Sequence, residues 1–287
     1  MKSVPVPFRD DRLTVGPLKL HVVEAGDPDA PAVLFLHGWP ESSRSWLPVM
    51  ALAAADHRAV AIDLPGIGGS VGAATDGSKA ALAAAVHGVV GALGLRDPVL
   101  VGQDIGGMVT YSYLREYGDE LRAAVIMDVV IPGLDPWAEV IANPYIWHFA
   151  LHAVPDLPET LVQGNQRRYF DYFYDQLSAD PAAIPDEARD AYARAYGSTA
   201  ALTAGFDWYR AFPRDAERNA ADTGPVDTPL LYLRGEHERG DIAEYLDGFR
   251  KAGLTGLDHG TVPAAGHFTQ EEAPAETWRL IADFIHR

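Results

Sequence analysis

The residue in this chain best suited to covalent chemistry is Asp104, at the centre of a glycine-rich turn. Residues 99–101 are apolar and predict a short strand, and residues 102–107, with the sequence GQDIGG, predict a tight turn into a helix. Gly102 and Gly106 stand two residues on either side of Asp104, where a Cβ atom would crowd the turn. This spacing is typical of a nucleophile elbow, a strained strand-to-helix turn that exposes one side chain above a parallel sheet.

The chemistry expected at this turn follows from the carboxylate of Asp104. An aspartate is ionised at neutral pH, since its reference pKa is about 3.9, so it needs no base to remove a proton before it attacks. Carboxylates are recognised covalent nucleophiles. The sequence therefore predicts a covalent ester on Asp104. The alternative is a structural aspartate that caps the following helix.

A candidate acid and a candidate base follow Asp104 along the chain, in the order nucleophile, acid, histidine. His267 lies in a Gly-His-Phe loop after the last predicted strand, and it is the expected base that activates water against the ester. Two acids compete to orient it. Asp128 ends the strand that follows the elbow, whereas Glu238 follows a later strand over residues 229–233. We favour Asp128.

A second strand end supplies the groups that would stabilise an oxyanion. Residues 37–40, with the sequence HGWP, follow an apolar strand predicted over residues 32–36. The backbone N–H groups of Trp39 and Ile105 are expected to converge on the carboxyl group of Asp104. Proline has no N–H, so the HGWP proline fixes this loop without donating.

Short apolar runs alternate with helical segments over most of the chain. We expect strands near residues 32–36, 58–62, 99–101, 123–128, 229–233 and 258–262, and helices near residues 45–55, 79–95, 106–117, 242–252 and 273–286. An antiparallel hairpin is expected over residues 12–26. This alternation predicts an α/β fold, with a mostly parallel central sheet flanked by helices. Ligands of such sheets bind at the carboxyl ends of the strands, where the candidate residues lie.

The alternation of strands and helices stops in the middle of the chain. The segment after residue 131 is rich in aromatic residues, and its periodic pieces favour helices. We interpret residues 132–223 as a helical cap inserted between two parts of an α/β core, which comprise residues 1–131 and 224–287.

The composition limits the partners of this chain. It has 287 residues, no cysteine and a net charge of −17, from 23 basic and 40 acidic residues. Such a surface repels nucleic-acid phosphates and small anions, so we expect a small neutral substrate. No run of about 18 apolar residues predicts a membrane span, and the N-terminus lacks an apolar signal core, so we expect a cytoplasmic protein. The sequence leaves a homodimer open.

Three motifs together resemble the Asp-nucleophile branch of the α/β-hydrolases. They are HGWP at residues 37–40, GQDIGG at residues 102–107 and GHF at residues 266–268. This branch contains epoxide hydrolases, haloalkane dehalogenases and haloacetate dehalogenases. The finer resemblance is to Cif-type epoxide hydrolases, through WHF at residues 147–149 and YRA at residues 209–211.

The resemblance implies roles for further residues. His148 and Tyr209 match the cap residues that donate hydrogen bonds to the epoxide oxygen as the ring opens. Asp128 matches the acid of Cif-type enzymes, although in those enzymes the acid is glutamate. The implied reaction converts an epoxide to a vicinal diol and needs no metal or cofactor.

Departures from the dehalogenase patterns set the order of the alternatives. Haloalkane dehalogenases place tryptophan directly after the nucleophile, where this chain has Ile105. Haloacetate dehalogenases place arginines just after the nucleophile, where this chain has Ile105 and Met108, and tryptophan after the cap histidine, where it has Phe149. Their cap histidine and tyrosine nevertheless match His148 and Tyr209, so a dehalogenase is the second hypothesis. A non-catalytic binding protein of hydrolase fold is the alternative from another class.

Overall fold

The parallel strands of this protein form most of one eight-stranded sheet. The structure is a computed structural model that describes residues 6–73 and 76–287. The strand order is β1-β2-β4-β3-β5-β6-β7-β8. The hairpin of β1 (Arg9–Val15) and β2 (Leu18–Ala25) joins β4 in antiparallel register. The remaining strands pair in parallel, and they are β3 (Ala32–Leu36), β4 (Arg58–Ile62), β5 (Val99–Gln103), β6 (Ala123–Met127), β7 (Leu230–Gly235) and β8 (Leu257–Val262). The predicted α/β fold with a mostly parallel sheet is confirmed.

The central strands are apolar throughout because both faces of the sheet are covered. Successive side chains of a strand point to opposite faces. In β3, Val33 and Phe35 pack in one core cluster, whereas Leu34 and Leu36 pack in the other. A strand buried on both sides has no polar face, which explains the continuous apolar runs in the sequence.

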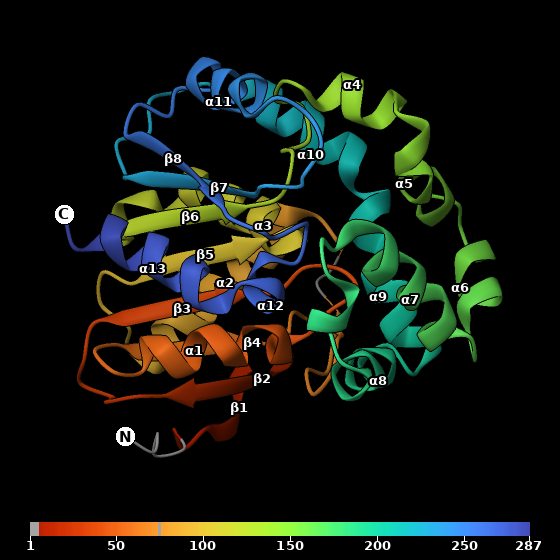
Figure 1. The fold of residues 1–287 in the computed structure, drawn as a ribbon, viewed down its shortest axis with the longest axis horizontal. Helices are drawn as coiled ribbons and strands as arrows, with labels where there is room; N and C mark the ends of the chain where they lie inside the picture. The colour runs from red at the N-terminus through yellow and green to blue at the C-terminus, as the bar shows by residue number, and fades with distance from the viewer. Residues whose placement is uncertain (1–5, 74–75) are drawn as a thin grey trace.

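Helices of the core lie on both faces of this sheet (Figure 1). The cluster that contains Val33 also includes side chains of α1 (Leu47–Ala53) and α13 (Pro274–Ile285). The other cluster includes side chains of α2 (Lys79–Leu93), α3 (Ile105–Tyr117) and α11 (Ile242–Lys251).

The helix predicted over residues 45–55 is divided, whereas the helix predicted over residues 273–286 is present as α13, preceded by a separate short helix. A 3₁₀ turn over Ser43–Trp46 precedes α1, and the short α12 (Thr269–Glu272) precedes α13. Both α1 and α13 begin with a proline in their first turn, where its missing N–H has no helical partner to lose.

Seven α-helices lie between β6 and β7, and we refer to them together as the helical insertion. They are α4 (Trp137–Ala142), α5 (Trp147–His152), α6 (Leu157–Val162), α7 (Gln166–Leu177), α8 (Asp186–Ala195), α9 (Thr199–Arg210) and α10 (Phe212–Ala221). Figure 1 shows most of them at the right of the molecule, beyond the end toward which β5 points. The division into core and cap domains stays a prediction.

Within the described ranges, no helix combines the length and the apolar character that crossing a membrane requires.

Candidate active site

The turn between β5 and α3 holds Asp104 in a strained backbone conformation. Its φ is +52° and its ψ is −124°, a backbone region that residues other than glycine rarely adopt. A Cβ atom on Gly102 would lie 2.1 Å from the carbonyl oxygen of Gly106, and one on Gly106 would lie 2.3 Å from that of Leu36. The two glycines are therefore required for the turn to pack against the sheet.

The carboxylate of Asp104 is held between a backbone donor and a histidine. The N–H of Trp39 donates to Oδ1 at 2.8 Å, and Oδ2 lies 3.8 Å from Nε2 of His267. A Cβ atom on Gly38 would lie 2.5 Å from the Cβ of Asp104, so only glycine permits this approach of the two loops. Ile105 opens α3, where the first backbone N–H groups have no partner within the helix. Its predicted contribution as the second oxyanion donor stays a prediction.

The acid beside His267 is Glu238, and our preference for Asp128 as its partner is wrong. Nδ1 of His267 and Oε1 of Glu238 are 2.6 Å apart. Asp128 is turned toward other donors, because its Oδ1 accepts the N–H of Gly235 at 2.7 Å and its Oδ2 accepts the hydroxyl of Thr269 at 2.9 Å. The carboxyl group of Asp128 thus joins the ends of β6 and β7 to α12.

The electrostatics of these groups differ although they lie close together. Burial raises the pKa of Asp128 to about 8, and the negative charge of Glu238 adds to this effect. Burial also acts to raise the pKa of Glu238, but the hydrogen bond from His267 and the charge of Arg234 hold it below its usual value. Glu238 is therefore the ionised acid at neutral pH.

His267 is a strong base in the free protein. Burial acts to lower its pKa, but its interactions with Asp104 and Glu238 outweigh burial and raise the pKa well above the ordinary value. The amide of Gln103 donates to the carbonyl oxygen of His267 at 2.9 Å and fixes the loop that carries the ring.

The helical insertion contributes two neutral hydrogen-bond donors, His148 from α5 and Tyr209 from α9. Their ring centroids are 5.9 Å apart, and the indole ring of Trp39 lies about equally close to both, at 6.1 and 5.8 Å. Burial lowers the pKa of His148 to about 3 and raises that of Tyr209 well above its ordinary value. At neutral pH His148 is a neutral imidazole and Tyr209 is a phenol. Nδ1 of His148 is buried with no hydrogen-bond partner among the described residues.

These groups share one cavity of about 130 Å³ between the sheet and the helical insertion. The residues that line it are Trp39, Asp104, Asp128, Val129, Val130, Val140, Ile146, His148, Phe149, Phe173, Leu177, Tyr209, Arg234, Glu238, Tyr245, His267 and Phe268. The cavity is comparable in size to engineered cavities of about 150 Å³ that accept benzene. It suits a small, mostly apolar molecule with the reacting atoms near Asp104.

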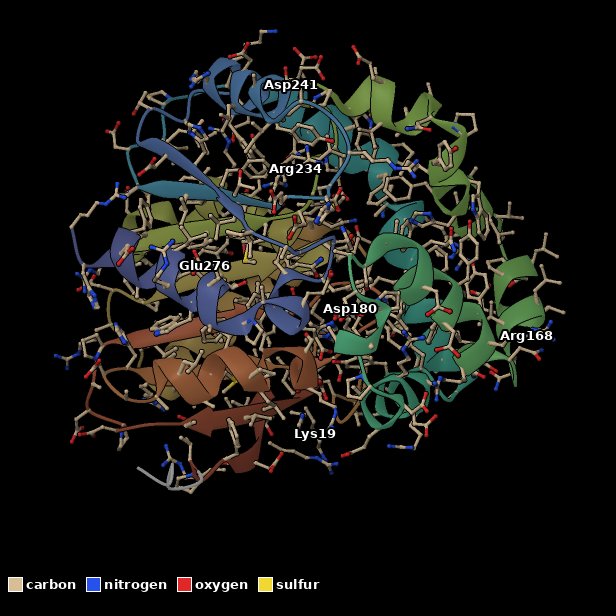
Figure 2. All side chains as sticks on the ribbon, in the orientation of Figure 1. Lys19, Arg168, Asp180, Arg234, Asp241 and Glu276 are labelled. Carbon is tan, nitrogen blue, oxygen red and sulfur yellow. The ribbon has the colours of Figure 1, made fainter. Side chains whose placement is uncertain are left out.

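Two residues of the site, Gln103 and Arg234, have no role predicted from the sequence. Gln103 lies inside the elbow motif, and Arg234 lies in β7, which is otherwise apolar up to its final glycine. A charged residue within a buried strand is itself a signal, because burying a charge costs free energy unless the charge is paired. Figure 2 shows Arg234 inside the molecule near β7, in contrast to Arg168 on the outer surface of the helical insertion.

No group of three or more histidine, cysteine, aspartate or glutamate side chains in the described part of the chain has an arrangement that could hold a metal ion.

Comparison with known proteins gives both a family and individual relatives. The family described as alpha/beta hydrolase fold matches residues 31–274. The chain is 29% identical over 263 residues to a soluble epoxide hydrolase from Corynebacterium sp. (strain C12), covering 89% of this chain and 90% of that protein. It is 27% identical over 300 residues to a fluoroacetate dehalogenase from Burkholderia sp., covering 97% and 94%. Among solved structures, Cfl2 from Burkholderia cenocepacia is 31% identical, with a TM-score of 0.88 and coverage of 97% of this chain and 96% of Cfl2. The epoxide hydrolase and the fluoroacetate dehalogenase agree with the branch that the three motifs indicate.

Proposed function

The chain belongs to the α/β hydrolase fold family, and on this basis we propose that it is an epoxide hydrolase that works through a covalent ester on Asp104. One observation carries the proposal. A carboxylate at the elbow shares a small cavity with two neutral donors, His148 and Tyr209, from the helical insertion. A carboxylate attacks without a base, and neutral donors suit a leaving oxygen that becomes an alkoxide.

In the first step, Asp104 attacks one carbon of the epoxide ring. An ester bond forms between Oδ2 and that carbon, the C–O bond of the ring breaks, and its electron pair remains on the ring oxygen. His148 and Tyr209 donate hydrogen bonds to this oxygen, where charge develops only in the transition state. The alkoxide then takes a proton from one of these donors, and the donor regains a proton from solvent water. The hydroxide left in solvent is neutralised by the proton that His267 releases once the ester has formed.

In the second step, His267 activates water. Ester formation removes the negative charge of Asp104, which is one cause of the raised pKa of His267, so the imidazole becomes neutral more readily. The neutral ring takes a proton from water, and the water oxygen attacks the ester carbonyl. Glu238 stabilises the imidazolium, and the N–H of Trp39 holds the oxyanion together with the predicted donor Ile105. The diol leaves with the proton from His267, and Asp104 keeps the oxygen of the water.

A dehalogenase is the second candidate because a fluoroacetate dehalogenase is among the relatives. It would use the same nucleophile and base, with halide as the leaving group. Ile105 and Met108 stand where arginines would hold a carboxylate substrate, and the cavity arginine, Arg234, is paired with Glu238. These features favour a neutral epoxide.

Incubation with a panel of substrates tests the proposal. We expect diol from at least one of styrene oxide, 1,2-epoxyhexane and cyclohexene oxide, no diol with Asp104→Ala, and little or no fluoride from fluoroacetate. Fluoride release that is faster than diol formation from every epoxide would make the protein a dehalogenase.

A further inference from the structure

Arg234 is a buried cation directly behind the acid of the site. It is 6% exposed, and its guanidinium lies over the ring of Tyr245, 4.3 Å from the ring centroid. Nη2 donates to Oε2 of Glu238 at 3.2 Å and to the carbonyl oxygen of Arg239. Oε1 of the same glutamate contacts His267, so Glu238 lies between two cationic partners.

Two carboxyl groups, Asp128 and Glu238, line this part of the cavity, and burial together with the charge of Glu238 raises the pKa of Asp128. Neighbouring buried carboxyl groups do not both ionise readily, because each charge opposes the other. Among the residues that the structure describes, Asp128 receives hydrogen bonds only from neutral groups, the N–H of Gly235 and the hydroxyl of Thr269. Glu238 has the guanidinium of Arg234 in addition to the imidazole.

We propose that Arg234 is a positioning residue that assigns the single negative charge of this carboxyl pair to Glu238, and so keeps the ionised acid against Nδ1 of His267. The role in catalysis rests on the proposed function, since it concerns the base of the second step. Without the guanidinium, Asp128 would take a larger share of the charge, at a position where its oxygens face Gly235 and Thr269 instead of the ring.

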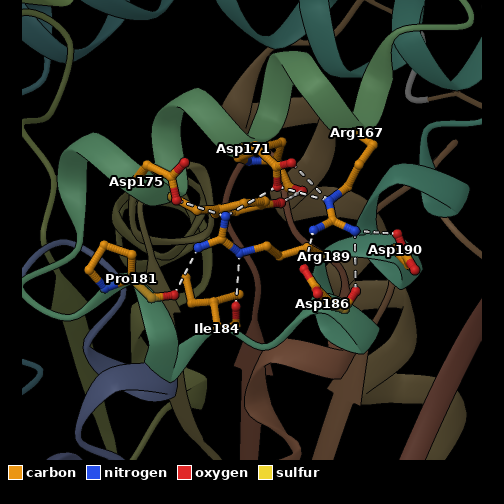
Figure 3. A network of polar contacts seen from close by, with 10 residues as sticks. Arg167, Asp171, Asp175, Pro181, Ile184, Asp186, Arg189 and Asp190 are labelled. Atoms are coloured by element: carbon orange, nitrogen blue, oxygen red, sulfur yellow. Dashed lines mark hydrogen bonds and ion pairs between the residues drawn. The ribbon is translucent and has the colours of Figure 1, made fainter.

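A second buried arginine shows what a purely structural role looks like. Arg189 of α8 is 8% exposed and binds Asp171 and Asp175 of α7 together with the carbonyl oxygens of Pro181 and Ile184 (Figure 3). It does not line the cavity. Arg189 is therefore a matched control, a buried arginine with acidic partners and no contact with His267 or Glu238.

The charged and titratable groups that face Glu238 come from four elements. They are Arg234 and Tyr232 from β7, His267 after β8, Asp128 after β6 and Tyr245 from α11. Burial raises the pKa of Tyr232 well above its ordinary value, so this phenol is neutral. Burial raises the pKa of Tyr245, so this phenol stays neutral. The distribution of charge is therefore decided among Arg234, His267 and the two carboxyl groups.

The test separates the two half-reactions by mass spectrometry of the intact protein, using the epoxide that the wild type converts fastest. We expect Arg234→Met to form the ester within about threefold of the wild-type rate and to hydrolyse it about 10- to 100-fold more slowly, the range known for partners that orient metal-binding histidines. Arg234→Lys restores most of the second rate. Arg189→Met changes neither rate.

A double variant tests the competition itself. Asp128→Asn removes the competing carboxyl group, so Asp128→Asn/Arg234→Met should hydrolyse the ester faster than Arg234→Met alone. The proposal would be overturned if Arg234→Met hydrolysed the ester at the wild-type rate. It would also be overturned if the double variant hydrolysed the ester no faster than Arg234→Met.

A measurement without substrate keeps this inference distinct from the proposed function. ¹⁵N NMR of the imidazole of His267 should give a lower pKa in Arg234→Met than in the wild type, and Asp128→Asn should reverse the change. An unchanged pKa would overturn the charge assignment even if epoxides are hydrolysed. Absence of any ester in the wild type would overturn the proposed function and leave this titration as the test. If Arg234→Met does not fold, Arg234→Gln replaces it in every arm.

Discussion

The polar groups at the carboxyl ends of the strands differ from those between α7 and α8 of the helical insertion. In the insertion, Arg167 and Arg189 bind four aspartates and several carbonyl oxygens, so that each guanidinium group is paired within the network (Figure 3). At the strand ends, the carboxylate of Asp104 has one backbone donor and a histidine that is 3.8 Å away. The first network holds two helices together, whereas the second leaves groups available to a substrate.

The two regions contribute different kinds of groups to the cavity. The core supplies every ionised group that lines the cavity, and the insertion supplies only neutral polar groups and apolar side chains there. An arginine therefore cannot be interpreted from its burial alone. Arg189 and Arg234 are almost equally buried, but only Arg234 contacts the acid beside His267.

The sharpest test of the strand-end region compares its two acids. We expect Glu238→Gln to lower the rate of ester hydrolysis by about 10²- to 10⁴-fold, because it removes the charge that stabilises the imidazolium. Asp128→Asn should cost far less, since Asp128 does not contact the ring. Single-turnover kinetics check both. A severe loss in Asp128→Asn with a mild one in Glu238→Gln would restore our original assignment.

The contribution of the insertion to chemistry is tested by Tyr209→Phe. This change keeps the packed ring and removes one donor, so ester formation should slow by about 10²- to 10³-fold, as in other sites that stabilise an oxyanion. Pre-steady-state alkylation of Asp104 measures it. Tyr172→Phe is the control, because Tyr172 of α7 is 46% exposed and lies in the same insertion. Equal rates in both variants would return Tyr209 to a packing role.

The network of the insertion should affect stability and leave the rate unchanged. Arg189→Met leaves Asp171 and Asp175 without this partner, and we expect a loss of about 1–3 kcal/mol in the free energy of unfolding. Thermal unfolding measures the loss, and kcat is measured well below the transition. A fall in kcat at low temperature would show that this network also shapes the cavity.

The last prediction concerns the pH dependence of stability and Glu271. Burial raises its pKa to about 8, far above the value of about 4.3 for an unfolded glutamate. A pKa raised in the folded state gives stability that is complete below the unfolded pKa and is lost as pH rises through the folded pKa. Glu271→Gln should therefore differ least from the wild type at pH 5 and be more stable than the wild type at pH 9, by up to about 5 kcal/mol, since one pKa unit corresponds to about 1.36 kcal/mol.

Thermal unfolding at both pH values checks this prediction. Glu217→Gln, at an exposed glutamate, is the control and should show no such difference. A Glu271→Gln variant that is less stable than the wild type at pH 9 would contradict the raised pKa.

The sequence predicts the fold well because the signals for the fold are periodic and local. Apolar runs such as residues 32–36 mark strands buried on both faces. Glycines mark the turn around Asp104, because a Cβ atom would not fit at Gly102 or Gly106. The partner of His267 could not be predicted in this way. Asp128 and Glu238 both follow strands, so their positions in the sequence do not show which of them contacts His267. In the structure the N–H of Gly235 donates to Asp128, and this contact between separate strands is not visible in the sequence. Similarly, residue type alone does not distinguish Tyr209, which lines the cavity, from Tyr172, which is exposed.

The most direct test of the central claim is a single turnover of epoxide in ¹⁸O-labelled water with enzyme in excess. A covalent ester on Asp104 requires water to attack the carboxyl carbon, so the label should enter the side chain of Asp104 and leave the first diol unlabelled. Mass spectrometry of the peptide that contains Asp104, and of the diol, reads both positions. Label in the first diol, with none in Asp104, would mean that water attacks the epoxide directly and would contradict the account.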